Sequence, residues 1–183
     1  MELCIEQVTA SQWETSWEQA GLPGLELPTF ERLEAPGDLG SWVAPATILG
    51  WVAHEVEMGD GTTFQPADGA QQFPPYERKL MFCVLAYAYT RQMFDAEEIA
   101  RSCARDPVLR RLWDGGAPFP SDLQRFRRSN RAALERIVTG VFEKAIRHRF
   151  DLGRMVLPPE LEGDLQQLAA ERLDIARHVA AED

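Results

Sequence analysis

The stretch that decides the fold is YERKLMFCVLAYAYTR, residues 76–91. Every side chain from Leu80 to Tyr89 is apolar or aromatic, so apolar residues cover all sides of a helix formed here. A helix of that kind is typical of the centre of a folded domain. Pro74 and Pro75 come directly before it and would end any preceding helix. We therefore expect a mainly α-helical bundle built around one buried helix at residues 76–91.

Polar caps predict three further helices after this central one. Asp95, followed three residues later by a glutamate, fits an acidic capping box. Asp106 is a cap followed directly by Pro107, and proline suits the first position of a helix. Ser121 begins a full capping box that ends in a glutamine. The expected helices span 95–104, 106–113 and 121–150, the last as one continuous helix.

The helix expected at 121–150 has one apolar side and one basic side. At about 100° per residue, its buried stripe contains Leu123, Phe126, Leu134, Ile137, Val138 and Val141. The opposite side contains Arg125, Arg128, Ser129, Ala132 and Arg136. Arg127 and Asn130 fall inside the buried stripe, where we expect them to be structural polar residues. Because a buried guanidinium needs a partner, we expect Arg127 to meet a carboxylate, with Asp114 and Glu98 as the candidates.

The first turns of this helix carry the side chains that a DNA-binding helix uses. The residues expected to contact DNA are Gln124, Arg125, Arg128, Ser129 and Arg131. In a helix-turn-helix protein, the N-terminal residues of the second helix reach base edges in the major groove. Arginine pairs with guanine there, and glutamine pairs with adenine. The alternative is that these arginines are merely solvated on the open side of a surface helix.

The charge of the chain is unevenly distributed along the sequence. Residues 1–75, 76–150 and 151–183 carry net charges of −11, +6 and −5, which together give the −10 of the whole chain. A phosphate backbone responds to the local field, which fades over a Debye length of roughly 10 Å. The basic middle is therefore able to bind double-stranded DNA despite the acidic total. Alternatively, the acidic ends neutralise the basic middle within the molecule.

Several segments of the basic middle share their order and spacing with one known family. They are PYERKL at 75–80, LAYAY at 85–89, IARSC at 99–103, DPVLRRLW with Gly115 at 106–115, and PSDLQRFRR at 120–128. At these residues the chain resembles the N-terminal helical domain of bacterial insertion-sequence transposases of the DDE type, over about residues 75–145. The resemblance implies a helical DNA-binding domain. It carries a role in DNA binding onto Arg125, Arg127 and Arg128, which match the motif positions.

Two features depart from that family. Its members continue with a ribonuclease-H-like catalytic domain that binds Mg²⁺ through two aspartates and a glutamate, whereas residues 151–183 are all that follow Phe150 here. The family's glycine near the end of its first helix is replaced by Arg91 or Gln92. The resemblance therefore implies a protein that binds DNA without the catalytic half of a transposase.

The two acidic flanks are expected to form separate parts of the molecule. Residues 1–74 are expected to be an irregular lobe, in which residues 48–64 fold as a β-hairpin around Asp60-Gly61. Residues 151–183 contain an amphipathic helix whose apolar stripe is Leu161, Leu165, Leu168, Ile175 and Val179. That helix either docks onto the rest of the chain or forms the seam of a homodimer. The expected domains are 1–74, 75–150 and 151–183.

Other kinds of chemistry have no support in the sequence. The longest apolar run is too short for a membrane span and no signal-peptide pattern is visible, so we expect a cytoplasmic protein without a membrane partner. Cys4, Cys83 and Cys103 stand at no motif spacing, and no histidine has a cysteine or another histidine at ligand spacing. Arginines near Cys103 favour a lowered thiol pKa, and a packed structural thiol is the alternative. We expect no metal, no cofactor and no catalytic residue.

These expectations favour a bacterial, non-catalytic DNA-binding protein that acts as a regulator or accessory factor in transposition. The alternative is a scaffold for protein–protein interaction on the same fold, with DNA binding lost or masked by the acidic flanks. The acidic front lobe or the C-terminal helix would then bind the protein partner.

Overall fold

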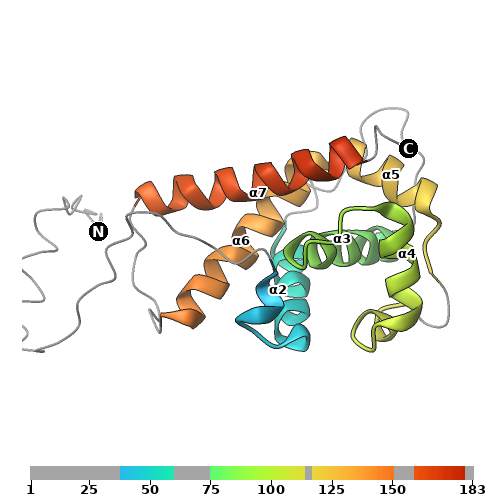
Figure 1. The fold of residues 1–183 in the computed structure, drawn as a ribbon, viewed down its shortest axis with the longest axis horizontal. Helices are drawn as coiled ribbons and strands as arrows, with labels where there is room; N and C mark the ends of the chain where they lie inside the picture. The colour runs from blue at the N-terminus through green and yellow to red at the C-terminus, as the bar shows by residue number, and fades with distance from the viewer. Residues whose placement is uncertain (1–37, 60–74, 114–116, 151–158, 180–183) are drawn as a thin grey trace, which may run out of the picture. The chain divides into compact units, whose positions relative to one another are not determined.

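The computed structural model describes residues 38–59, 75–113, 117–150 and 159–179 (Figure 1). The chain divides into two compact units, Met1–Arg32 and Leu33–Asp183, and every described residue belongs to the second unit. Within the described ranges, all regular structure is helical. The prediction of a mainly α-helical fold is therefore confirmed. The capping box that Ser11 forms with Glu14 also predicts a short helix to Ala20, which lies outside the described residues.

Helix α3, Pro75–Thr90, forms the centre of this unit. Every residue from Met81 to Thr90 is buried, and α3 packs against α2, α4, α5, α6 and α7. The continuous apolar run requires this position, because an apolar helix gains stability only when all its sides are covered. The prediction of a buried central helix is confirmed.

Helix α2, Pro45–Met58, occupies part of the predicted hairpin. Pro45 stands at the first helical position, which its fixed φ favours. Ile48, Val52 and Val56 are buried at a spacing of four residues, which is one side of a helix. This side packs against α3 and α6. The hairpin is therefore wrong over residues 48–58, and its turn at Asp60-Gly61 lies outside the described residues. The short 3₁₀ helix η1, Leu39–Ser41, precedes α2.

Helix α4, Ala96–Arg105, begins at the predicted cap. The Asp95 carboxylate accepts the backbone N–H of Glu97 at 3.3 Å and that of Glu98 at 2.8 Å. The helix expected at 106–113 is only a 3₁₀ turn, η2, Leu109–Arg111. It follows Asp106, whose carboxylate accepts the backbone N–H of Val108 at 2.7 Å.

The predicted helix 121–150 is two helices, α5, Pro120–Ser129, and α6, Arg131–Arg149. The capping box is wrong, because the cap residue is Phe119 and proline takes the first helical position, which leaves Ser121 inside the first turn. The helix breaks at Asn130, where φ is −127° and ψ is 25°. The Asn130 side chain donates to the carbonyl of Phe126 at 2.8 Å. Asparagine ends a helix in this way because its amide competes with the backbone for hydrogen bonds.

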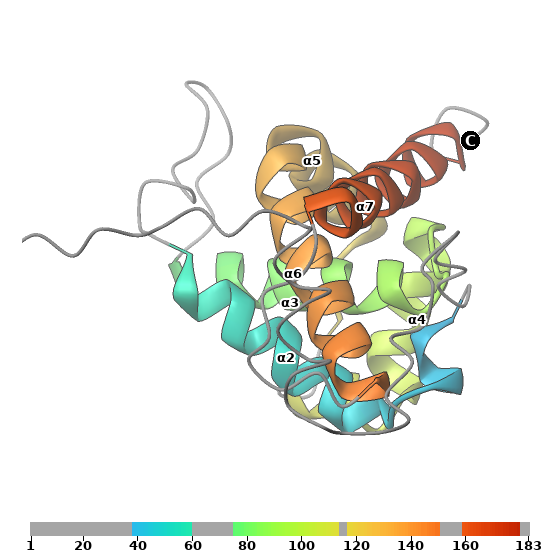
Figure 2. The ribbon, with the colours of Figure 1, turned by 90° about the vertical axis from the view of Figure 1, so that its left-hand side faces the viewer.

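Helix α7, Pro159–Val179, packs along α6. Figure 2 shows α6 between α2 and α7, in agreement with the contacts of α6 with both. The buried apolar residues of α7 are Leu161, Leu165, Ala169, Leu173 and Ala176. The predicted stripe is wrong at Ile175, which is 44% exposed. Ala169 and Ala176 are buried instead. The side chains at a contact set the distance between packed helices, so small alanines allow a close approach.

Candidate nucleic-acid interface

Helix α5 presents the predicted outward residues on its exposed side. Arg125, Arg128 and Ser129 are exposed, and Gln124 is half-buried. The Arg128 Nε donates to the carbonyl of Gln124 at 3.3 Å, so this guanidinium lies back along its own helix. The predicted apolar stripe of α5 and α6 is buried throughout: Leu123, Phe126, Leu134, Ile137, Val138 and Val141. The two sides of these helices are therefore assigned as predicted, except that Asn130, which was expected inside the buried stripe, is half-buried and divides the two helices.

Arg127 is buried as predicted, with 8% of its surface exposed, but its partner is not a carboxylate. Its Nη1 donates to the backbone carbonyl of Phe94 at 3.1 Å. Glu98 is exposed at the start of α4, and Asp114 lies outside the described residues. A backbone carbonyl replaces the expected acid because the segment between α3 and α4 passes beside α5, which the sequence does not show.

Arg131 is half-exposed and pairs with the acidic C-terminal helix. Its Nη1 lies 3.0 Å from Oδ1 of Asp174 on α7, and Nη2 of Arg177 lies 3.4 Å from the same oxygen. The hydrogen bond from Arg131 lowers the pKa of Asp174, and the charges of Arg131 and Arg177 add to this effect. The predicted DNA contact Arg131 is thus held by a carboxylate of α7.

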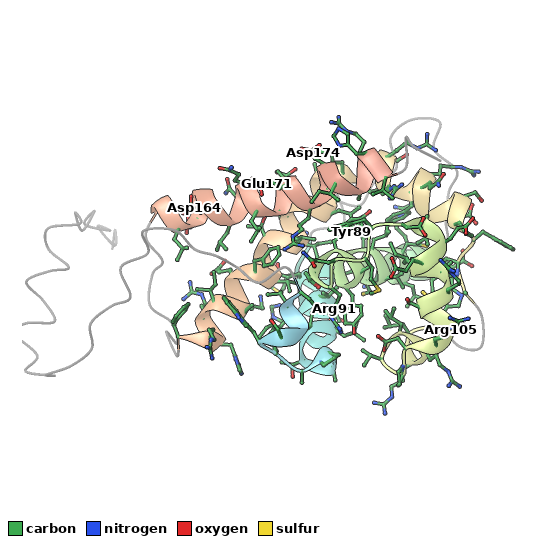
Figure 3. All side chains as sticks on the ribbon, in the orientation of Figure 1. Tyr89, Arg91, Arg105, Asp164, Glu171 and Asp174 are labelled. Atoms are coloured by element: carbon green, nitrogen blue, oxygen red, sulfur yellow. The ribbon has the colours of Figure 1, made fainter. Side chains whose placement is uncertain are left out.

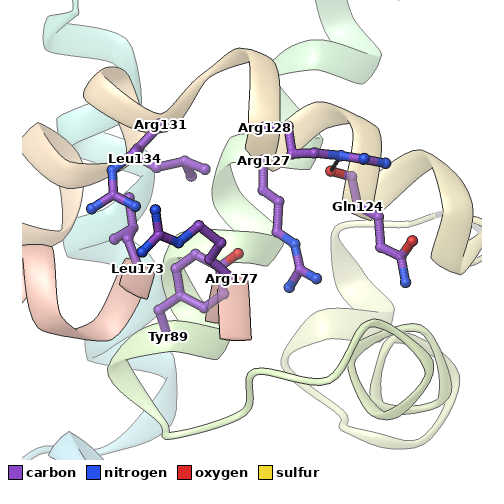
Figure 4. A pocket seen from close by; sticks show the side chains of 8 residues that line it. All are labelled: Tyr89, Gln124, Arg127, Arg128, Arg131, Leu134, Leu173 and Arg177. Carbon is purple, nitrogen blue, oxygen red and sulfur yellow. Dashed lines mark hydrogen bonds between the residues drawn. The ribbon is translucent and has the colours of Figure 1, made fainter. Parts of the chain in front are cut away.

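A pocket of about 430 Å³ lies beside α5. We call it the arginine pocket; it is lined by Tyr89, Gln124, Arg127, Arg128, Arg131, Leu134, Leu173 and Arg177 (Figure 4). It brings together three of the predicted DNA-contact residues, whereas Arg125 and Ser129 do not line it. Tyr89 and Arg177 were not predicted to be part of a site. They come from α3 and α7, far from α5 in the sequence, and no local motif connects them.

Ion pairs among the described residues join the basic middle of the chain to its acidic flanks. Asp38 pairs with Arg91 and Glu55 with Lys144, and Asp174 pairs with Arg131. Figure 3 shows Asp174 on α7 and Arg91 at the end of α3. Arg91 also donates to the hydroxyl of Tyr87 at 3.1 Å, and that hydroxyl donates to Asp106 at 3.3 Å. These contacts place acidic side chains of the flanks against basic side chains of the middle of the chain.

The thiols of Cys83 and Cys103 are packing groups. Burial, with a smaller contribution from the carboxylates of Glu57 and Asp106 respectively, raises the pKa of each to about 11. The arginines near Cys103 therefore do not activate it. Among the described residues, no group of three or more His, Cys, Asp or Glu side chains is placed to hold a metal ion. No helix in the described ranges has the length and apolarity needed to cross a bilayer.

Comparison with protein-family models, with curated proteins and with solved structures finds no match for this chain.

Proposed function

We propose that this protein binds double-stranded DNA without catalysis, as a regulator or accessory factor derived from the helical domain of an insertion-sequence transposase. Helix α5 enters the major groove as the second helix of a helix-turn-helix arrangement, after α4 and η2. Arg125 and Arg128 contact base edges or phosphates, and Gln124 and Ser129 lie beside them.

The observation that carries this proposal is the exposed basic side of α5. Arg125 and Arg128 are exposed on one side of this helix, while Leu123 and Phe126 on the other side are buried. A helix held by its apolar side can present its arginines to a groove at little conformational cost, since its backbone is already ordered. The order of α4, η2 and α5 along the chain is the order that such a motif requires.

A second candidate function is a protein–protein interaction scaffold on the same fold. The observation that favours it is the pairing of Asp174 with both Arg131 and Arg177. An acidic helix that holds arginines beside the DNA-binding side would weaken binding to a polyanion. In this candidate, the acidic surface of α7 faces the protein partner, and the full-length chain ignores DNA at physiological salt.

The test is binding of the full-length chain to a labelled duplex pool of random sequence, followed over a range of salt concentrations. Each neutralised phosphate contributes about 0.9 to the slope of log affinity against log salt. We expect Arg125→Ala and Arg128→Ala each to reduce that slope by about 0.9. On a sequence selected from the pool, each change should cost roughly 1–3 kcal/mol of binding free energy.

Arg149→Ala is the matched control, because it removes the same charge from an exposed position at the other end of α6. At 1.5 Å per residue it lies about 27 Å from the start of that helix. It should weaken binding less than either change on α5. If the wild-type chain binds no duplex at low salt, the DNA-binding proposal is refuted and the scaffold is favoured.

A further inference from the structure

The arginine pocket is lined by two side chains that each have a buried polar atom without a partner at normal hydrogen-bond geometry among the described residues. These atoms are the hydroxyl of Tyr89 and Nη2 of Arg127. Tyr89 is 1% exposed and Arg127 is 8% exposed. A buried donor without a partner is costly, and native proteins rarely keep one unless water or a ligand completes it. Both atoms belong to side chains that line the same pocket, which indicates a ligand with hydrogen-bond acceptors.

One of the two donors is held firmly in place. Nη1 of Arg127 is fixed by the carbonyl of Phe94 at 3.1 Å, which leaves Nη2 available to the pocket. Burial raises the pKa of Tyr89, and the positive charge of the neighbouring Arg127 and a weak hydrogen-bond interaction with its guanidinium oppose this only in part. The hydroxyl is therefore protonated at neutral pH and able to donate. A pre-positioned guanidinium and a phenol together suit an oxyanion.

The charges around the pocket favour a ligand with more than one negative charge. Arg127, Arg128, Arg131 and Arg177 line it, and no carboxylate is among the described residues that do so. Asp174 beside it bonds two of the four, Arg131 and Arg177. Figure 4 shows Arg127 between Arg128 and Gln124 on one side and Arg177 and Tyr89 on the other.

We propose that the arginine pocket binds a small organic phosphate. The phosphate oxygens accept from Arg127, Arg128 and the Tyr89 hydroxyl, because guanidinium groups match phosphate geometry in a bidentate manner. The organic part lies on Leu134 and Leu173, the two apolar walls. A volume of about 430 Å³ lies within the range of small-molecule pockets. This site shares Arg128 with the DNA-binding side of α5, but it also depends on Tyr89, Arg127 and Leu173, which that side does not use.

The test is isothermal titration calorimetry of the full-length chain with four probes: phenyl phosphate, inorganic phosphate, benzoate and phenol. We expect phenyl phosphate to bind about tenfold more tightly than inorganic phosphate, because only its ring covers the two leucines. Benzoate carries one charge instead of two and should bind about tenfold more weakly than phenyl phosphate. Phenol, which has no anion, should give no binding heat.

Two variants connect the binding to the unpartnered atoms. Tyr89→Phe removes only the hydroxyl, and Arg127→Met removes the guanidinium while keeping a side chain of similar length. Each should raise the Kd for phenyl phosphate by about tenfold or more. Arg149→Met, at the far end of α6, is the matched control and should leave the Kd unchanged. Thermal unfolding of each variant shows that it is folded, and if Arg127→Met does not fold, Tyr89→Phe decides.

Three results would overturn the proposal: no binding of phenyl phosphate to the wild-type chain at millimolar concentration, an unchanged Kd in the folded Tyr89→Phe variant, or equal affinity for benzoate. All titrations are done without DNA. A failure of duplex binding therefore leaves this proposal standing, and a failure here leaves duplex binding by Arg125 and Arg128 to its own test.

Discussion

Gln92 holds a backbone conformation that suits glycine better than glutamine. Its φ of 59° lies in the left-handed region, and the N–H of Met93 closes the end of α3 on the carbonyl of Ala88 at 2.9 Å. A side chain at such a position costs about 1 kcal/mol relative to glycine. We expect Gln92→Gly to raise the free energy of unfolding by about 0.5–1 kcal/mol, measured by urea denaturation.

Gln92→Ala separates backbone strain from loss of the glutamine side chain, since alanine keeps the Cβ. It should give no increase in the free energy of unfolding. Equal stabilisation by the two variants would show that strain at this residue is not the cause.

For single residues, the sequence predicted well which side chains are buried. It predicted less well which groups those side chains contact. The burial of Arg127 follows from the helical period, which is a local property. Its partner, the carbonyl of Phe94, depends on how the segment after α3 passes α5. Tyr89 and Arg177 were missed for the same reason, because only the packing of α3 and α7 against α5 and α6 makes them neighbours of Arg127.

Helices α2 and α6 meet where a glycine faces a carboxylate. A Cβ added at Gly140 would lie 2.5 Å from the carboxylate of Glu55, which is bonded to Lys144. Two effects therefore compete in Gly140→Ala: alanine favours the helix by about 1 kcal/mol, and the new methyl group displaces Glu55 from its ion pair. We expect the displacement to win, so that Gly140→Ala lowers the free energy of unfolding by about 1 kcal/mol.

The same substitution should act in the opposite direction once the carboxylate is removed. In a Glu55→Ala background, Gly140→Ala should raise the free energy of unfolding by about 1 kcal/mol, because only the gain in helix propensity is left. Urea denaturation of the four proteins completes a double-mutant cycle with a coupling energy of about 2 kcal/mol. Additive effects would contradict the close contact between the two helices.

At the scale of elements, the sequence predicted the helices that have a strong apolar pattern. It predicted less well the residues at which helices begin and end. The central helix α3 followed from its uninterrupted apolar run. Helix α2 was missed because the turn pair Asp60-Gly61 favoured a hairpin, although Ile48, Val52 and Val56 already had helical spacing. The break at Asn130 was missed because the apolar stripe continues across it, so periodicity alone predicts a single helix. The domain boundaries at 74 and 150 stay predictions.

At the scale of the whole molecule, the acidic helix α7 could limit the access of DNA to the basic helix α5, and a substitution in α7 tests this. Asp174→Asn removes the carboxylate that pairs with Arg131 and Arg177. If α5 binds DNA, the released Arg131 can neutralise one more phosphate. We expect the variant to bind the duplex pool more tightly and with a salt slope steeper by about 0.9. Fluorescence anisotropy across a series of salt concentrations measures both quantities.

The control for this variant must change the net charge equally without touching Arg131. Asp164→Asn does so, since Asp164 is exposed on the same helix about 15 Å away at 1.5 Å per residue.

The pKa of Asp174 is lowered by the hydrogen bond from Arg131. The ion pair therefore stabilises the fold above the ordinary pKa of this carboxyl and is lost only as the pH falls through the lowered value. Between about pH 5 and pH 8 the pair is intact, so the wild-type chain should bind more weakly than Asp174→Asn across this whole range. If the two aspartate variants bind DNA equally well, general charge explains the effect, and if neither gains affinity, α7 does not restrain the basic helix.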